Sequence, residues 1–331
     1  MSLNAVNALE YALEKEVPFQ VGRTLVINAP APINIDGDVT AYQSFKPWYN
    51  ALKSQTQWDV HKDWHRLGEG FDTAILVLPK QKIQAQGWIA RAFQLLKKNG
   101  IIVCALDNKA GGASLAKSHK GTSSVSKNKS RVIWAQKEGF INEDICESWI
   151  ENAGLQPQEN TELLTAPGMF SWRKPDIGSQ ILLNNLPDTL PGKGADFGCG
   201  YGYLSHGILS TKNIDHLTCI DADTRSLKAA QENLKSFSNT GFEWLDLTSE
   251  APSTMPYDWI IMNPPFHEDI KHSTQIGQDF IQNAAQSLGA KGILYMVANK
   301  HLPYEKPLRE CFSDVETLAE EQGFKVIRAM V

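Results

Sequence analysis

Five consecutive residues, Asn263-Pro264-Pro265-Phe266-His267, have the groups needed to hold a flat exocyclic amine. Such an amine is a poor nucleophile, because its lone pair is delocalised into the attached ring. The Asn263 side-chain oxygen and the Pro264 carbonyl could each accept one of its two N–H groups. Gripping both hydrogens in one plane would favour the pyramidal, attacking form of the nitrogen. The prolines would stiffen this loop and bring no competing N–H.

The aromatic residue of this motif completes the expected site, because Phe266 can stack on a base and fix its plane. We therefore expect Asn263, Pro264 and Phe266 to be the catalytic residues. His267 could be a general base, although a structural or base-contacting histidine is favoured. Taken alone, the motif could also be a strand that ends in a proline turn.

A second motif, Asp196-Phe197-Gly198-Cys199-Gly200-Tyr201-Gly202, lies upstream and predicts a sharp turn between a strand and a helix. Glycine is needed where backbone must approach a ligand, since it has no Cβ. Tyr203 occupies the position of the last glycine in the dinucleotide fingerprint GxGxxG, which argues against NAD. The turn instead suits another nucleoside.

Acidic residues at three successive predicted strand ends indicate which nucleoside. Asp196 could meet the cationic amino group of a methionine moiety, Asp221 both ribose hydroxyls, and Asp246 the adenine amine. An aspartate at a strand end can also be only a helix cap. Together with the turn at Gly198 and Gly200, the three acids predict an S-adenosylmethionine (SAM) site. The expected reaction is methyl transfer to a planar nitrogen, with no metal and no strong base.

Alternating apolar segments indicate the elements that position these motifs. In the second half, strands are predicted over 193–197, 216–220, 242–245, 257–262 and 292–298, with helices between them. Repeated strand-helix units imply a parallel sheet covered on both faces, with ligands bound beyond the carboxyl ends of its strands. Segments 315–318 and 324–330 are expected to form an antiparallel pair at the sheet edge.

The first half resembles a faded copy of this unit. Segment 71–79 aligns with 257–265, and in this alignment Val77 stands where Asn263 stands and Leu78 replaces Pro264. No glycine-rich turn precedes Phe71. We therefore expect an α/β protein with two tandem Rossmann-like class I methyltransferase domains, 1–165 and 166–331, of which the N-terminal one is degenerate. Their junction is expected within Thr165–Ile177, where prolines and glycine interrupt the periodicity.

Composition bounds the partners. The 331 residues are 42% hydrophobic and 21% charged, which is typical of a soluble globular protein. The net charge of −5 does not suggest a nucleic-acid binder, but no acid lies between Asp107 and Glu138. That stretch contains the cations Lys109, Lys117, Lys120, Lys127, Lys129, Arg131 and Lys137. It is either a solvated, Gly/Ser-rich loop or a patch that meets phosphates.

Cysteine usage points to a compartment. The five cysteines form no CxxC pair, and Cys104 and Cys219 lie in apolar runs that suit buried free thiols. No His/Cys spacing predicts a metal site, no run is long enough to span a bilayer, and the first residues lack a secretory pattern. We expect a cytoplasmic protein, and the tandem domains are compatible with a monomer.

The motifs and their order resemble the bacterial ribosomal RNA guanine-N2 methyltransferases of the RsmC/RlmG type. The resemblance is strong over about residues 165–331 and weak over 71–137. It rests on Gly178-Ser179-Gln180, on segments 196–202 and 263–267, on the segment from Val297 to Tyr304, and on the closing segment from Gly323 to Ala329.

This resemblance implies a catalytic C-terminal domain and a degenerate N-terminal domain that helps to hold RNA. It implies guanine in small-subunit (16S) rRNA as the target, with large-subunit (23S) rRNA second. Carried over by position, Asp196, Gly198, Gly200, Asp221 and Asp246 would bind SAM. The base would be held by Asn263, Pro264 and Phe266, with Pro265, His267 and Lys300 as further substrate-binding residues.

Two other readings stay open. An adenine-N6 or protein-glutamine methyltransferase would use the same four-residue motif, because an amide and an aryl amine pose the same geometric problem. A non-catalytic RNA-binding assembly factor is also possible, since the first half tolerates loss of the motif.

Overall fold

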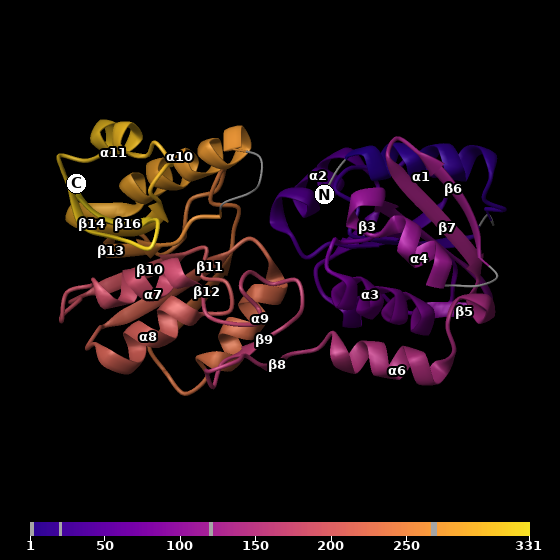
Figure 1. The fold of residues 1–331 in the computed structure, drawn as a ribbon, viewed down its shortest axis with the longest axis horizontal. Coiled ribbons are helices and arrows are strands. Elements are labelled where there is room, and N and C mark those ends of the chain that lie inside the picture. The colour runs from indigo at the N-terminus through magenta and orange to yellow at the C-terminus, as the bar shows by residue number, and fades with distance from the viewer. Residues whose placement is uncertain (1–2, 20–21, 119–121, 266–269) are drawn as a thin grey trace. The chain divides into compact units, whose positions relative to one another are not determined.

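The computed structural model describes residues 3–19, 22–118, 122–265 and 270–331, so Phe266 and His267 lie outside the described residues. The chain divides into two compact units (Figure 1). The first comprises Met1–Leu155 with Ala166–Gly168, and the second comprises Gln156–Thr165 with Met169–Val331. Each unit contains a seven-stranded sheet of its own.

The second unit alternates strands with helices as the sequence predicts. Its elements are β8 (Gln156–Pro157), β9 (Leu164–Thr165), α7 (Ile177–Asn184), β10 (Lys193–Phe197), α8 (Tyr203–Thr211), β11 (His216–Asp221), α9 (Thr224–Asn233), β12 (Thr240–Trp244), β13 (Tyr257–Met262), α10 (Ile270–Ser287), β14 (Leu288–Asn299), α11 (Glu305–Cys311), β15 (Asp314–Glu321) and β16 (Phe324–Met330). The sheet order is β12-β11-β10-β13-β14-β16-β15. The strands from β12 to β14 pair in parallel, whereas β16 is antiparallel to both of its neighbours, β14 and β15.

The first unit repeats this order as β3-β2-β1-β4-β5-β7-β6. Its elements are α1 (Leu3–Lys15), β1 (Arg23–Ile27), β2 (Asp38–Tyr42), α2 (Lys46–Gln55), β3 (Asp59–His61), η1 (Trp64–Arg66), β4 (Phe71–Val77), α3 (Lys82–Leu95), β5 (Leu96–Asp107), η2 (Asn108–Ala110), α4 (Gly112–Ser118), β6 (Ser123–Lys127), β7 (Ser130–Gln136), α5 (Lys137–Phe140) and α6 (Glu143–Asn152). The expected pair of α/β domains with one topology is confirmed.

Both faces of the second sheet are buried, as the apolar strands require. Ile260 and Met262 of β13 join the core under α10 and α11, whereas Trp259 and Ile261 join the opposite core under α7, α8 and α9. Side chains alternate between the faces of a strand, so one six-residue strand supplies both cores. The strand ends are thereby held in fixed register beside one another.

Strand register identifies equivalent positions in the two units. Ile27 pairs with Leu76 in the first unit as Phe197 pairs with Met262 in the second. The next residue along the chain is therefore Val77, the last residue of β4, in one unit and Asn263, just beyond β13, in the other. An aliphatic side chain cannot accept from an amine, which is the physical sense in which the first unit is degenerate.

The other strand ends of the first unit are closed by its own side chains. Asn28 stands at the position of Gly198, and its amide donates to the Val77 carbonyl at 2.9 Å. Gln43 stands at the position of Asp221 and donates to the Ala29 carbonyl at 2.9 Å. Neither position carries an acid that could hold ribose hydroxyls.

An aromatic stack occupies a further strand-end position of the first unit. Counting from the β2–β3 register, Trp64 stands where Asp246 stands in the second unit. The rings of Trp64 and Tyr42 stack with centroids 3.9 Å apart. The first unit has thus replaced an acid by aromatic packing.

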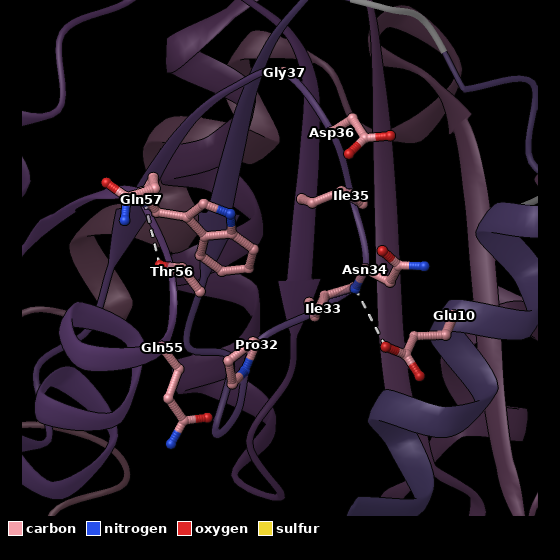
Figure 2. Close-up of a pocket in the computed structure, with 11 residues that line it drawn as sticks. Glu10, Pro32, Ile33, Asn34, Ile35, Asp36, Gly37, Gln55, Thr56 and Gln57 are labelled. Atoms are coloured by element: carbon pink, nitrogen blue, oxygen red, sulfur yellow. Dashed lines mark hydrogen bonds between the residues drawn. The ribbon is translucent and has the colours of Figure 1, made fainter.

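No helix links β1 and β2, although α8 links the equivalent strands of the second unit. The linking loop instead lines a cavity of about 550 Å³ together with Glu10 of α1 and Trp58 (Figure 2). The Asn34 main-chain N–H donates to Glu10 at 3.2 Å and ties the loop to α1. This loop is a local departure between the two units.

Over its described residues, 108–118 and 122–137, the basic stretch is not a loop, contrary to one of the two sequence readings, and Lys120 lies outside the described residues. It forms η2, α4, β6 and β7, and β7 pairs with both β5 and β6. Val132 and Ile133 are buried there, and their apolar run explains the strand. The Gly and Ser content that suggested a loop falls in the short segments around this strand.

All five cysteines are free thiols, and Cys104 and Cys219 are buried as predicted. Burial raises the pKa of the Cys104 thiol well above its usual range, which keeps it protonated. None of the helices in the described part of the chain is both long enough and apolar enough to cross a membrane.

A glycine in β10 controls how the central strands of the second unit meet. An ideal Cβ on Gly194 would lie 2.2 Å from the Trp259 ring, which is almost fully buried. We expect Gly194→Ala to lower the free energy of unfolding by about 1–3 kcal/mol, because the indole must shift within a packed core. Chemical denaturation followed by circular dichroism measures this loss.

Gly289→Ala is the matched control in the same sheet, since its Cβ would lie 3.6 Å from its nearest neighbour, an ordinary contact. Equal midpoints for the two variants would mean that Trp259 does not constrain β10.

Candidate active site

The predicted site residues converge at the carboxyl edge of the second sheet. Strand β10 lies between β11 and β13. Successive strands are added on one side of β10 up to β12 and then on its other side from β13, so the strand order reverses at β10. Crevices at such a reversal are the usual ligand sites of open α/β sheets. Asp196 lies in β10, Asp221 ends β11, Asp246 follows β12 and Asn263 follows β13.

The glycine turn after β10 adopts backbone that other residues rarely take. Gly198 has φ of 75° and Gly200 has φ of 56°. The main-chain N–H groups of Gly198 and Cys199 both donate to the Ile220 carbonyl, at 2.8 and 2.9 Å. No heavy atom lies within 4 Å of an ideal Cβ on Gly200, so a ligand could approach the backbone there.

The turn is braced from the β8–β9 hairpin. Gln158 follows β8, and its amide donates to the Tyr201 hydroxyl at 2.8 Å. Asn233 at the end of α9 donates to the Tyr201 carbonyl at 2.8 Å and to the Leu164 carbonyl at 2.9 Å. Sequence reasoning missed this support, because the contributing residues are scattered along the chain. The bracing holds the turn in one conformation.

Asp196 is fully buried and only half satisfied. Its Oδ2 accepts a 2.6 Å hydrogen bond from the Ser205 hydroxyl, while Oδ1 has no partner among the described residues. Burial raises the pKa of the Asp196 carboxyl to about 7, with a smaller contribution from the charge of Asp221. A buried acceptor without a donor is costly. A cationic N–H group would relieve that cost.

Asp221 anchors the glycine turn to β11. Its Oδ2 accepts from the Gly200 N–H at 2.9 Å and its Oδ1 from the Asp223 N–H at 2.8 Å. Burial raises the pKa of the Asp221 carboxyl to about 6, although these N–H groups favour the ionised form. Each oxygen has capacity for a second hydrogen bond, so the carboxylate can still accept two hydroxyls.

Asp246 shapes the turn after β12. Its Oδ1 accepts from the Thr248 N–H at 3.0 Å and hydroxyl at 2.6 Å, and Oδ2 accepts from the Ser249 hydroxyl at 2.9 Å. A carboxylate can accept about four hydrogen bonds. Asp246 therefore combines the capping role that an aspartate at a strand end often has with one remaining acceptor position.

Asn263 is held by its nitrogen. Nδ2 donates to Asp176 Oδ2 at 2.9 Å and to Ser179 Oγ at 2.8 Å. An ionised carboxylate only accepts, so this contact fixes which end of the amide faces Asp176. Asn263 Oδ1 is buried and has no partner among the described residues. The arrangement leaves one oriented acceptor beside the buried Pro264.

Asp176 and Ser179 hold Asn263 but were not predicted as site residues, although the segment Gly178-Ser179-Gln180 carries part of the family resemblance. Asp176 caps α7 by accepting from the Ser179 N–H at 2.8 Å, so the same carboxylate orders the helix start and Asn263. Gly178 lets this turn approach β16, since an ideal Cβ there would lie 2.9 Å from the Phe324 ring. An acid three residues before serine was the available signal, because it is typical of a helix N-cap.

Of the remaining predicted residues, the structure describes Lys300 and Pro265. Lys300 follows β14, and its ammonium forms an ion pair with Glu320 of β15 at 2.5 Å. Pro265 is half-buried next to Pro264. Phe266 and His267 lie outside the described residues. Within the described ranges, no group of three or more His, Cys, Asp or Glu side chains could hold a metal ion.

Comparison with known proteins places this geometry in a family. The methyltransferase small domain family matches residues 160–328, which include the glycine turn, the three strand-end acids, Asp176 and Asn263. The ribosomal RNA small subunit methyltransferase C of Shewanella pealeana is 33% identical over 268 residues, covering 78% of this chain and 77% of the relative. The protein of the same name from Shewanella halifaxensis is 31% identical, with the same coverage.

A solved structure extends the likeness to both units. The T. thermophilus 16S rRNA N2 G1207 methyltransferase (RsmC), in complex with AdoMet and guanosine, superposes with a TM-score of 0.80. It is 22% identical, and the match covers 98% of this chain and 91% of that one. This likeness shows that the fold is shared over the whole chain. With the sequence relatives, it leads to one assignment: the chain belongs to the ribosomal RNA small subunit methyltransferase C family.

Proposed function

We propose that this protein transfers a methyl group from SAM to the exocyclic N2 amine of a guanine in small-subunit rRNA. The observation that carries the proposal is the Asn263 amide, whose nitrogen is held by Asp176 and Ser179 while its oxygen has no partner among the described residues. Asp196 Oδ1 is a second buried acceptor without a partner in the described ranges, and it lies in the adjacent strand of the same sheet. The first suits a flat amine and the second a cation.

The residues present fit SAM. Asp196 would accept from the methionine ammonium, Asp221 from the ribose hydroxyls and Asp246 from the adenine amine. The backbone at Gly198 and Gly200 would approach the cofactor, because no Cβ stands in the way. When bound, SAM supplies a methyl group on a sulfonium, with a neutral thioether as the leaving group.

The protein's own contribution is positioning. Asn263 Oδ1 and the Pro264 carbonyl would each accept one N–H of the guanine amine and hold its nitrogen toward the methyl carbon. As the N–C bond forms and the S–C bond breaks, these oxygens stabilise the positive charge that develops on the nitrogen. The methylated nitrogen then releases one proton and becomes neutral. No strong base is required, since that cation is acidic.

The names of the relatives specify small-subunit rRNA, and the name of the structural neighbour specifies N2 of G1207 in 16S rRNA. Both support guanine of small-subunit rRNA as the substrate. We also propose that Pro265, Phe266, His267 and Lys300 contact the substrate. For Lys300 this requires release from Glu320 or contact beside it. A monomer that works in the cytoplasm, where rRNA is found, completes the proposal.

The direct test is transfer of labelled methyl from SAM to small subunits, large subunits and the corresponding naked rRNAs, followed by nucleoside identification. Label in N2-methylguanosine of small-subunit rRNA is expected. Label in large-subunit rRNA alone would identify that rRNA as the substrate. N6-methyladenosine or labelled protein would refute methylation of guanine N2. Absence of any transfer would favour a non-catalytic assembly factor.

Asn263→Ala tests the acceptor itself. We expect the methylation rate to fall at least about 10²-fold, the loss typical of removing one preorganised polar contact, while SAM binding is retained. Single-turnover methylation and equilibrium dialysis of SAM measure the two quantities. An unchanged rate would remove Asn263 from the mechanism.

Ser179→Ala tests whether the orientation of Asn263 matters. Ser179 should not meet the substrate, so the expected result is a fall in kcat of about ten-fold with KM for SAM nearly unchanged. Ser179→Thr keeps a hydroxyl and should recover part of the loss. Gln180→Ala is the control, because Gln180 is exposed on the same helix turn. Equal kcat values for Ser179→Ala and Gln180→Ala would refute a positioning role.

The raised pKa values of Asp196 and Asp221 predict a pH dependence. The pKa values of both carboxyls are higher in the folded chain, at about 7 and about 6, than the ordinary value of 3.8. The free energy of unfolding of the free protein therefore falls as pH rises from about 4 to about 7. SAM needs the ionised forms. Its affinity should therefore rise with pH up to about 7, by up to about tenfold per pH unit for each proton released.

Calorimetric titration of SAM at several pH values measures this profile. Asp196→Asn should reduce the slope by one proton as well as weaken binding, whereas Asp188→Asn, at an exposed position, should leave it unchanged. A pH-independent affinity in the parent protein would contradict the assignment of these carboxylates.

A further inference from the structure

The first unit contains a concavity with cationic rims. It has a volume of about 470 Å³ and an apolar floor that includes Leu78 and Leu106. Its lining also includes Lys80, Lys109 and Lys129, which come from three separate segments of the chain. All three lysines are exposed. A volume of this size accommodates a small ligand.

The concavity lies at the carboxyl edge of the first sheet, where β4 and β5 end. The same edge of the second sheet carries the candidate active site. By the register of the central strands, Lys80 stands three residues after Val77, as Phe266 stands three residues after Asn263. In sequence, Lys80 of the first unit therefore corresponds to Phe266, which lies outside the described residues.

The structure also shows which cations of the basic stretch are available. Lys137 donates to the Leu96 carbonyl at 3.0 Å, and its ammonium lies 4.5 Å from the centre of the Phe93 ring. Lys127 lies over the Tyr11 ring at 4.1 Å. These contacts hold Lys127 and Lys137 within the unit.

Lys109 and Lys129 differ from these cations. Neither forms an ion pair with another residue in the described ranges. The main-chain N–H of Asn108 donates to the Lys129 carbonyl at 2.9 Å, which ties η2 to the β6–β7 turn. Asn128 and Lys129 both have left-handed backbone, with φ of 50° and 59°, so the turn is tight. The two lysines are thus carried on segments bonded to each other.

One acid lines the concavity, and it is engaged elsewhere. Asp107 ends β5, and its Oδ1 accepts a 2.7 Å hydrogen bond from the Ser130 hydroxyl. With three lysines and one aspartate, the lining has a net charge of +2 in a chain whose net charge is −5. The lining therefore favours an anionic ligand, although the chain as a whole is negatively charged.

We propose that this concavity binds one nucleotide of a single-stranded RNA segment, with Lys109 and Lys129 at the phosphates and the apolar floor under the sugar and base. Phosphates account for the lysines, and the apolar floor distinguishes a nucleotide from a simple anion. The proposal rests on the proposed function in naming RNA as the occupant. It assigns to the first unit a contact that anchors the substrate and takes no part in methyl transfer.

The experiment measures binding of a short fluorescent single-stranded RNA to the full chain by anisotropy, without SAM, over a series of salt concentrations. In Lys109→Gln/Lys129→Gln, affinity should fall on the order of ten-fold at low salt, and the salt slope should decrease by about 1.4. Lys53→Gln/Lys98→Gln removes the same charge at exposed positions of the same unit and should change both far less. An unchanged midpoint of chemical denaturation shows that each variant is folded.

The floor is tested separately by Ala110→Asp, at a half-buried position of the lining, which should weaken RNA binding more than it weakens binding of polyglutamate. Equal salt slopes in the two double variants would overturn the site, and so would polyglutamate binding as tight as RNA binding. Because the assay needs neither SAM nor turnover, the two proposals can fail separately. If the double variant loses RNA binding but the parent chain methylates no rRNA, only the proposed function is refuted. If the parent chain methylates rRNA but the double variant binds RNA as tightly as the parent, only the site is refuted.

Discussion

An amide can serve as a directed acceptor only if its nitrogen is held by other groups, and that requirement organises the second unit. Asp176 and Ser179 take both N–H groups of Asn263. Free rotation would let the amide present either end to an incoming amine, and the wrong end would repel it. The N-cap of α7 removes that freedom, so a helix start and a strand end together form one functional element.

The glycine turn depends on a comparable arrangement. Asp221 accepts from the Gly200 N–H, and Gln158 and Asn233 hold Tyr201 from outside the turn. The partners of the site are therefore largely set before any ligand arrives. Preset dipoles of this kind need no reorganisation during the reaction, which is how a site without a strong base can accelerate transfer to a weak nucleophile.

The two units show how one frame supports different edges. Strand order and central register are the same in both, because alternating apolar strands bury both faces of each sheet. Only the residues just beyond the strands differ. Asn28, Gln43 and the Tyr42–Trp64 pair fill the first edge, whereas the described part of the second edge contains acceptors without a partner. A fold can thus persist after its chemistry is lost, since packing and chemistry use different positions.

Much of this was predictable along the chain. Segments 193–197 and 257–262 were predicted strands with the bounds of β10 and β13, because the first leads directly into the glycine turn and the second is an apolar run that ends at Asn263. The alignment of Val77 with Asn263 agrees with the strand register. The strands before residue 62 were not predicted, because β1, β2 and β3 are short and no familiar motif lies between them. The basic stretch was ambiguous, since charge and Gly/Ser content do not distinguish a loop from a hairpin.

By itself, the sequence determined the chemical groups at the strand ends, the order of the α/β units and the loss of the asparagine motif in the first half. These depend on local periodicity and on residue type. Only the tertiary structure decided which partners each group has: Asp176 with Asn263 across 87 positions, or Lys109 and Lys129 with Lys80 around one concavity. The reason is physical. Hydrogen bonds and Coulomb interactions act over a few ångströms, and the folded sheet sets that spacing irrespective of distance along the chain.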